Sequence, residues 1–221
     1  MQILKSVVGR KVFMAITGQC MVLFAVVHML GNSSIFIGPD GINAYAKHLH
    51  DLGPLVWIFR AGLFAFVAIH ICYGIQLTLE NNAANPTAYA VKKQLKATFA
   101  STTMIWTGLL IALFVIFHIL HFTARVTPGV VQGVDALGRY DVFTMVVSAF
   151  KNGGIAFVYV VAMCALFFHL SHGIQSFFQT MGWNTDRTQC TISTIGKAVA
   201  FILLAGYAVI PISILASALI K

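Results

Sequence analysis

The sequence predicts an all-α integral membrane protein, built as one bundle of five transmembrane helices. Of its 221 residues, 59% are hydrophobic and 9% charged, whereas a soluble domain is about half apolar and about a quarter charged. Five apolar runs occur, at about 12–34, 55–79, 102–124, 154–178 and 196–220. Each can span a bilayer, because a hydrocarbon core of about 30 Å needs about 20 helical residues. The segments between the runs are too short for a second folded domain, so residues 1–221 are expected to form a single domain.

Charge and cysteine content exclude several kinds of partner and metal site. The 14 Lys and Arg outnumber the 6 Asp and Glu, an excess that in a membrane protein reflects loop anchoring and lipid contact, so we expect no nucleic-acid partner. None of the four cysteines lies in a C-x-x-C motif, which argues against a thiolate metal site, an iron–sulphur cluster and covalently attached haem. The first run is too long for a signal peptide and lacks an A-x-A-type cleavage site. With the N-terminus on the inner side, slightly more Lys and Arg residues lie inside than outside, and this small bias favours that orientation.

Two pairs of runs share motifs. Residues 17–30, TGQCMVLFAVVHML, and 107–120, TGLLIALFVIFHIL, both read T-G-x4-L-F-x3-H-x-L. Residues 70–77, HICYGIQL, and 169–176, HLSHGIQS, both read H-x-x-x-G-I-Q. Helix one therefore resembles helix three and helix two resembles helix four, as in a parallel internal duplication. The fifth helix has no counterpart and is expected to be peripheral.

The repeat singles out four histidines: His28, His70, His118 and His169. Each lies about 16 residues into its run, roughly 24 Å along the helix axis. Because adjacent spans run in opposite directions, His28 and His118 should lie near one face of the bilayer, and His70 and His169 near the other. An ionisable residue inside a membrane is by default a candidate functional residue. The alternative for a single histidine is a neutral ring that donates to a neighbouring backbone carbonyl.

Paired imidazoles at two depths favour haem over other occupants. Zinc would need three or four ligands, typically with carboxylate or thiolate help, and a proton relay would also need carboxylates at depth. Two imidazoles from different helices suit the two axial faces of a haem iron. The sequence therefore predicts two haems b, an outer one between His28 and His118 and an inner one between His70 and His169. Such a protein would transfer electrons between a quinone and a soluble redox partner.

Further candidates surround these histidines. Gly74 and Gly173 follow His70 and His169 by one helical turn and would leave room for a macrocycle. Gly18 and Gly108 should lie at the depth of the inner haem, although ordinary small-residue packing explains all four glycines equally well. The polar candidates for contact with a quinone or a haem propionate are Lys47, His48, His50, Asp51, His121, His172, Arg10, Lys11, Lys96 and Arg125. Their alternatives are a solvated loop helix, satisfied interior histidines and interfacial snorkelling.

The fourth run carries F-H-x-S-x-G-x-x-S-F at residues 168–177. With histidines in four of five helices, the chain resembles the cytochrome b membrane anchor of succinate dehydrogenases and fumarate reductases, and within that family the single-subunit, dihaem type. The resemblance covers nearly the whole chain. It implies an anchor in the bacterial cytoplasmic (inner) membrane, joined on its inner face to a flavoprotein, which interconverts succinate and fumarate, and an iron–sulphur subunit. It also implies menaquinone or menaquinol as substrate, the same histidine pairing, and leaves open a dimer of complexes.

One feature departs from the family. Some fumarate reductases of this type carry a glutamate just ahead of the fourth histidine, implicated in transmembrane proton movement. Here positions 166–168 are Leu-Phe-Phe, so that role is not carried over and the physiological direction stays open. Two alternative functions also remain: a cytochrome b anchor of a hydrogenase or formate dehydrogenase, which typically has four spans, and a haem-free transporter or scaffold.

Overall fold

The computed structural model describes residues 6–84 and 97–220, and these residues are helical apart from turns, short connections and one isolated bridge between Val134 and Tyr140. Lys96, one of the polar candidates, lies outside the described residues. The helices are α2 (Val7–Asn32), α3 (Pro39–Asp51), α4 (Pro54–Ala83), α5 (Phe99–Thr102), α6 (Met104–His118), α7 (Val142–Phe150), α8 (Gly153–Thr180) and α9 (Gln189–Leu219), with a 3₁₀ turn, η1 (Ser33–Ile37), after α2 and a π-helical turn, η2 (Ile119–Thr123), after α6.

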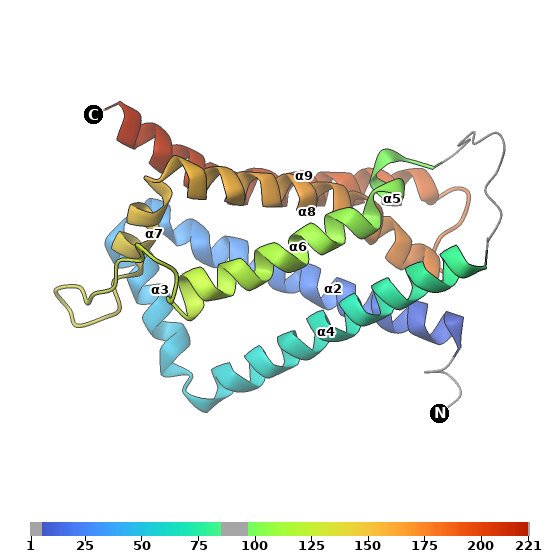
Figure 1. Ribbon diagram of the computed structural model, residues 1–221, viewed down its shortest axis with the longest axis horizontal. Coiled ribbons are helices and arrows are strands. Elements are labelled where there is room, and N and C mark those ends of the chain that lie inside the picture. Colours follow the sequence, from blue (N-terminus) through green and yellow to red (C-terminus); the bar gives the residue numbers. More distant parts are fainter. Residues whose placement is uncertain (1–5, 85–96, 221) are drawn as a thin grey trace.

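Five of these segments are long and apolar enough to cross a membrane, which confirms the five predicted spans. They are Val7–Ile37, Pro54–Ala83, Met104–Thr123, Gly153–Thr180 and Gln189–Leu219. Successive spans run in opposite directions along the long axis (Figure 1). Local chemistry defines several helix starts: the Ser6 hydroxyl and the Asn152 side chain accept backbone N–H groups of the first turn, and Pro54 occupies the first turn of α4.

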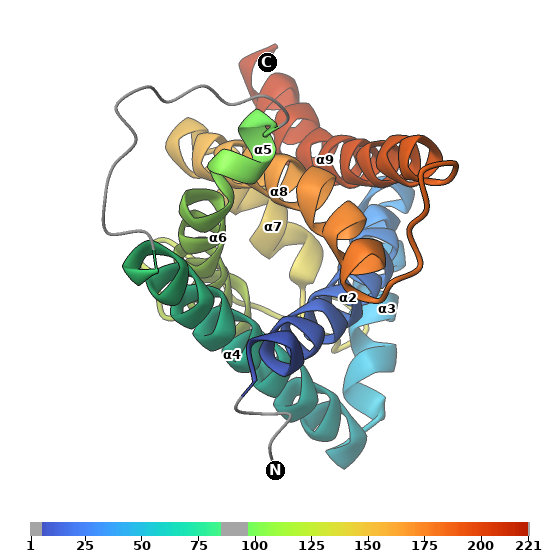
Figure 2. The ribbon, with the colours of Figure 1, turned by 90° about the vertical axis from the view of Figure 1, so that its right-hand side faces the viewer.

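Four of the spans, α2, α4, α6 and α8, surround the centre of the bundle, and α9 lies outside them against α8 and α2 (Figure 2). The predicted peripheral position of the fifth helix is therefore confirmed. Where apolar burial gives no driving force, small residues let membrane helices approach closely. Gly196 of α9 illustrates this, because a Cβ there would lie 3.3 Å from the Ile174 side chain of α8.

At the end of the bundle where α3 and α7 lie, a polar cluster fixes the connection after η2. Asn43 of α3 is fully buried; its Oδ1 accepts the Phe143 backbone N–H at 2.9 Å, and its amide donates to Asp135 and Asp141. Arg139 donates to Asp135 at 2.6 Å. Burial of the Asp135 carboxyl opposes ionisation, but the backbone N–H and guanidinium of Arg139 prevail and lower the pKa of Asp135 to about 2.

Candidate haem-binding site

The inner histidine pair joins α4 to α8. The rings of His70 and His169 have centroids 6.2 Å apart and planes inclined by 65°. The two residues are far apart in sequence, and they meet because α4 and α8 present the same level of the bundle to each other. The structure thus brings together the two rings that the repeat paired by depth.

The hydrogen bond made by His70 fixes its tautomer. Its Nδ1 lies 2.9 Å from the backbone carbonyl oxygen of Met14, on α2. A carbonyl can only accept, so Nδ1 carries the proton and Nε2 keeps a free lone pair. A metal-ligating histidine usually has its other ring nitrogen engaged in this way, which orients the ring and raises its basicity.

His169 has the equivalent environment on the other half of the bundle. Its Nδ1 lies 3.3 Å from the Thr107 hydroxyl of α6. The Thr107 hydroxyl proton is already directed to carbonyls of its own helix at 3.1 Å. The hydroxyl oxygen therefore accepts from Nδ1–H, and Nε2 of His169 is again the free nitrogen.

Glycines let both inner rings pack directly on a neighbouring backbone. A Cβ at Gly18 would lie 2.9 Å from Cε1 of His70, and a Cβ at Gly108 would lie 3.1 Å from Cε1 of His169. Gly18 and Gly108 thus contact the histidine of the following span, at the opposite depth from the histidine of their own helix. Gly74 has a different neighbour, since a Cβ there would meet only the Met14 sulphur, at 4.0 Å. Gly173 likewise faces Met104, at 3.5 Å.

The outer histidine pair joins α2 to the end of α6. The ring centroids of His28 and His118 are 5.9 Å apart and the planes are inclined by 83°. His28 stacks on Phe24, with centroids 5.2 Å apart. Nδ1 of His118 lies 3.3 Å from the Tyr159 hydroxyl of α8. The π-helical turn η2 begins directly after His118, and such turns occur frequently at functional sites.

Both pairs fit the dimensions of a bis-histidine iron site. A metal–imidazole bond is about 2.0 Å long, so two rings on opposite sides of one metal ion have centres about 6 Å apart. The observed separations are 5.9 and 6.2 Å. Among residues 6–84 and 97–220, no three His, Cys, Asp or Glu side chains form a group that could hold a metal. The imidazoles come in twos, the number of axial ligands in a bis-histidine haem; their role as iron ligands stays a prediction.

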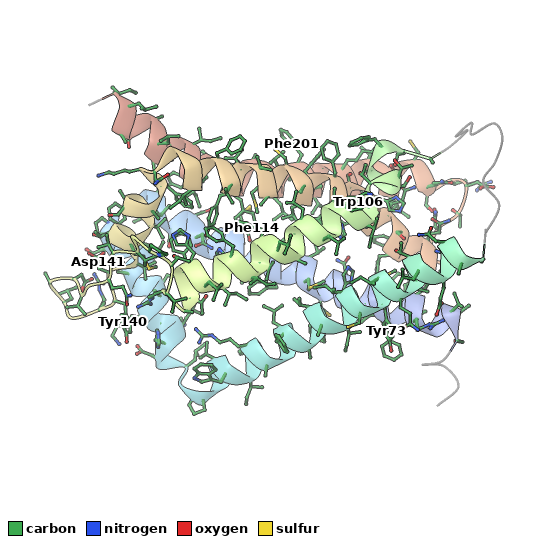
Figure 3. All side chains as sticks on the ribbon, viewed as in Figure 1. Tyr73, Trp106, Phe114, Tyr140, Asp141 and Phe201 are labelled. Atoms are coloured by element: carbon green, nitrogen blue, oxygen red, sulfur yellow. The ribbon has the colours of Figure 1, made fainter. Side chains whose placement is uncertain are left out.

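The polar candidates on α3 do not reach the histidine pairs. Lys47, His48, His50 and Asp51 are all exposed, and Lys47 forms an ion pair with Asp51 one turn away. The His50 ring instead stands 5.3 Å from the ring of Tyr140, and His50 also borders an open hollow of about 360 Å³. Tyr140 and Asp141 mark this end of the bundle in Figure 3, opposite to the end where Tyr73 lies.

Arg10 lies one turn before Met14 on α2, at the level next to the inner pair. Its guanidinium forms a bidentate ion pair with Glu80 of α4, at 2.8 and 2.7 Å. Only 8% of Arg10 is exposed, and its Nε–H is buried without a partner in the described part of the chain. This buried N–H is therefore left for another acceptor. Lys11, the next residue, is exposed.

The remaining polar candidates are Arg125, His172 and His121. The Arg125 guanidinium is held 4.8 Å above the Tyr140 ring, and His172 is half-buried on α8. His121 is 2% exposed, and its Nδ1 lies 3.0 Å from the Tyr159 hydroxyl. No sequence motif singled out Tyr159, which contacts both His118 and His121. Met14 and Met104 were also missed, although both begin an M-x-x-T-G motif that recurs in helices one and three.

The fold and its paired imidazoles define an integral membrane protein that crosses the bilayer five times. Comparison with known families gives a specific assignment. Residues 78–208 match the family model of the succinate dehydrogenase/fumarate reductase transmembrane subunit. Because the match covers more than half of the chain, this protein belongs to that family, and the predicted family is confirmed. It is a membrane anchor of an oxidoreductase complex, whose enzymatic activity lies in partner subunits. No curated protein and no solved structure matches the chain.

Proposed function

We propose that this chain is the dihaem cytochrome b anchor of a succinate:menaquinone or menaquinol:fumarate oxidoreductase. It would hold one haem b between His70 and His169 and a second between His28 and His118. The observation that carries the proposal is the agreement between two independent facts: the repeat pairs these histidines by depth, and their rings lie 6.2 and 5.9 Å apart in the structure.

The chain prepares the inner imidazoles for metal binding. The Met14 carbonyl and the Thr107 hydroxyl accept from Nδ1–H of His70 and His169, so each ring presents Nε2 as the free nitrogen. The backbone at Gly18 and Gly108 supports the ring edges and limits their rotation. These contacts hold both rings in place, which reduces the reorganisation that ligand binding would require.

Bound haem would supply reversible one-electron chemistry, and two such groups along the bundle would link a quinone to the iron–sulphur subunit. Arg10, with one buried donor free, is our candidate partner for a propionate of the inner haem. We place the flavoprotein and iron–sulphur subunits next to the inner pair, on the cytoplasmic side of a bacterial inner membrane. The α3 residues Lys47, His48, His50 and Asp51 remain quinone candidates, reached from the membrane surface.

The decisive experiment counts haems in the purified complex. The wild type should show a reduced-minus-oxidised haem b spectrum with two haems per anchor, reducible by succinate. His70→Ala and His169→Ala should each remove one haem and leave the outer one in place. The matched control is His172→Ala, on the same face of α8 one turn from His169, which should keep both haems.

Absence of any haem spectrum in the wild type would refute the proposal and favour the haem-free scaffold. Retention of both haems in His70→Ala and His169→Ala would refute the ligand assignment. Haem reduction by hydrogen or formate, but not by succinate, would favour an anchor of another redox complex.

A further inference from the structure

One tyrosine hydroxyl bridges two histidines at the outer end of the bundle. The Tyr159 hydroxyl of α8 lies 3.3 Å from Nδ1 of His118 and 3.0 Å from Nδ1 of His121. All three side chains belong to one cluster, in which His121 is 2% and Tyr159 7% exposed. Water is therefore a poor competitor for these hydrogen bonds, and the three polar groups must satisfy one another.

The π-helical turn and aromatic packing hold this arrangement. The turn η2 contains His121, so the chain after His118 departs from α-helical geometry and His121 turns to the same hydroxyl. The Tyr159 ring packs edge-on against Phe114 and Phe150, each with centroids 4.9 Å away. Figure 3 shows Phe114 on the side of α6 that faces α8. With the ring clamped in this way, the hydroxyl has little freedom to move from its two partners.

The number of protons in the cluster determines which group donates and which accepts in each hydrogen bond. A phenol has one proton, so Tyr159 donates to one histidine and accepts from the other. If Nε2 of His118 is the metal-binding nitrogen, its Nδ1 is protonated and must donate to the Tyr159 oxygen. The Tyr159 O–H then donates to Nδ1 of His121, which leaves the His121 proton on Nε2. Each hydrogen bond polarises the next, so His121 makes the Tyr159 oxygen a better acceptor for His118.

The inner pair has no such arrangement. Nδ1–H of His70 meets a backbone carbonyl, and that of His169 meets a threonine hydroxyl. At the repeat-related positions of Tyr159 and His121, the first half of the chain has Arg60 and Gly31. The cluster is therefore a feature of the outer site and of one of its two ligands.

From this geometry we infer that Tyr159, supported by His121, is a positioning residue that orients His118 and sets the reduction potential of the outer haem. The inference rests on the proposed function, since it needs a haem at His118. A hydrogen bond accepted from Nδ1–H makes the imidazole a more basic ligand. A more basic ligand stabilises the ferric state, so the bridge lowers the outer haem potential.

The test is a redox titration of the complex carrying Tyr159→Phe, which removes the hydroxyl and keeps the ring. Both haems should remain, and one potential should rise by about 59 mV, equal to a tenfold change in the reduction equilibrium of a one-electron couple. The ferric low-spin EPR signal of the same haem should also shift. His121→Leu should raise the same potential by less, and the double variant should match Tyr159→Phe alone, because the residues act in series.

Tyr207→Phe is the matched control. The Tyr207 ring lies 6.1 Å from the other outer ligand, His28, but its hydroxyl donates to the Ala25 carbonyl at 2.7 Å. This variant should leave both potentials unchanged. Unchanged or lowered potentials in Tyr159→Phe, or an equal shift in Tyr207→Phe, would overturn the inference while leaving the haem count intact. If Tyr159→Phe fails to assemble, an unchanged potential in His121→Leu overturns it instead. A wild type without haem would instead refute the proposed function.

Discussion

Gly18→Ala tests whether the inner site depends on direct packing of an imidazole against a helix backbone. The added Cβ would lie 2.9 Å from Cε1 of His70, whereas carbon atoms in contact prefer about 3.5–4.0 Å. One of the two must therefore move by about 0.6 Å or more. The His70 ring is not free to do so, because its Nδ1–H is bonded to the Met14 carbonyl, one turn away on the same helix as Gly18.

The free-energy cost of Gly18→Ala follows from these contacts. Forcing extra volume into a packed interface costs about 1–3 kcal/mol, and loss of the His70 hydrogen bond adds about 0.5–1.5 kcal/mol. We expect a total of about 1.5–4.5 kcal/mol against the geometry that would bind the inner haem, which corresponds to roughly 10- to 2,000-fold weaker binding. Gly108→Ala should act in the same direction but more weakly, since its Cβ would lie 3.1 Å from His169.

The assay is haem content per anchor from the reduced-minus-oxidised spectrum, followed while the purified protein is diluted. Gly18→Ala should lose one haem and keep the other. Gly62→Ala is the control on α4, the helix that carries His70, because a Cβ there meets nothing within 4 Å. Two retained haems with wild-type affinity in Gly18→Ala would show that the His70 ring does not rest on α2 at this position.

Four further variants test the contacts at the two ends of the bundle. Glu80→Ala should lower the free energy of unfolding in detergent by about 2 kcal/mol or more, because it leaves the buried Arg10 guanidinium unpaired. Arg10→Met should cost less, because the Glu80 side chain is 40% exposed and can be solvated. Equal losses in thermal unfolding of the two variants would contradict this. The pKa of Asp135 is lowered to about 2, so the stability that its carboxylate contributes should be complete above about pH 4 and lost as the pH falls towards 2. Asp135→Asn should remove this pH dependence, measured as the protection of residues 124–141 against proteolysis. Asn43→Ala should open the same segment at every pH, since the Phe143 N–H loses its acceptor; unchanged cleavage would refute that role.

The spans and the depth of the histidines could be predicted because both follow from simple lengths. Run length against bilayer thickness predicted a helix at 55–79, and α4 spans Pro54–Ala83. A fixed rise per residue and alternating direction then place His70 level with His169, and His28 level with His118. The repeat also indicated that Gly18 and Gly108 serve the opposite depth, where the structure sets them against His70 and His169.

The contacts that depend on how two helices rotate against each other could not be predicted in this way. Tyr159 belongs to no motif, and its repeat partner is Arg60, so its hydrogen bonds could not be predicted from a pattern. No motif connects Glu80 with Arg10, yet the two side chains form an ion pair. Such pairings require the packing of α2 on α4 or α6 on α8, which no linear spacing specifies.

The duplication explains why haem binding should join the two halves of this protein. Within each half, α2 orients the histidine of α4 through Gly18 and Met14, and α6 orients that of α8 in the same way. Each predicted iron site, however, takes one ligand from each half: His70 with His169, and His28 with His118. The family match begins at residue 78, so it includes one histidine of each pair and excludes the other. A half-bundle can orient an imidazole but cannot supply both axial ligands. Haem that bound only the assembled bundle would therefore stabilise the contact between the halves, by an amount that grows with the ratio of the haem concentration to its dissociation constant.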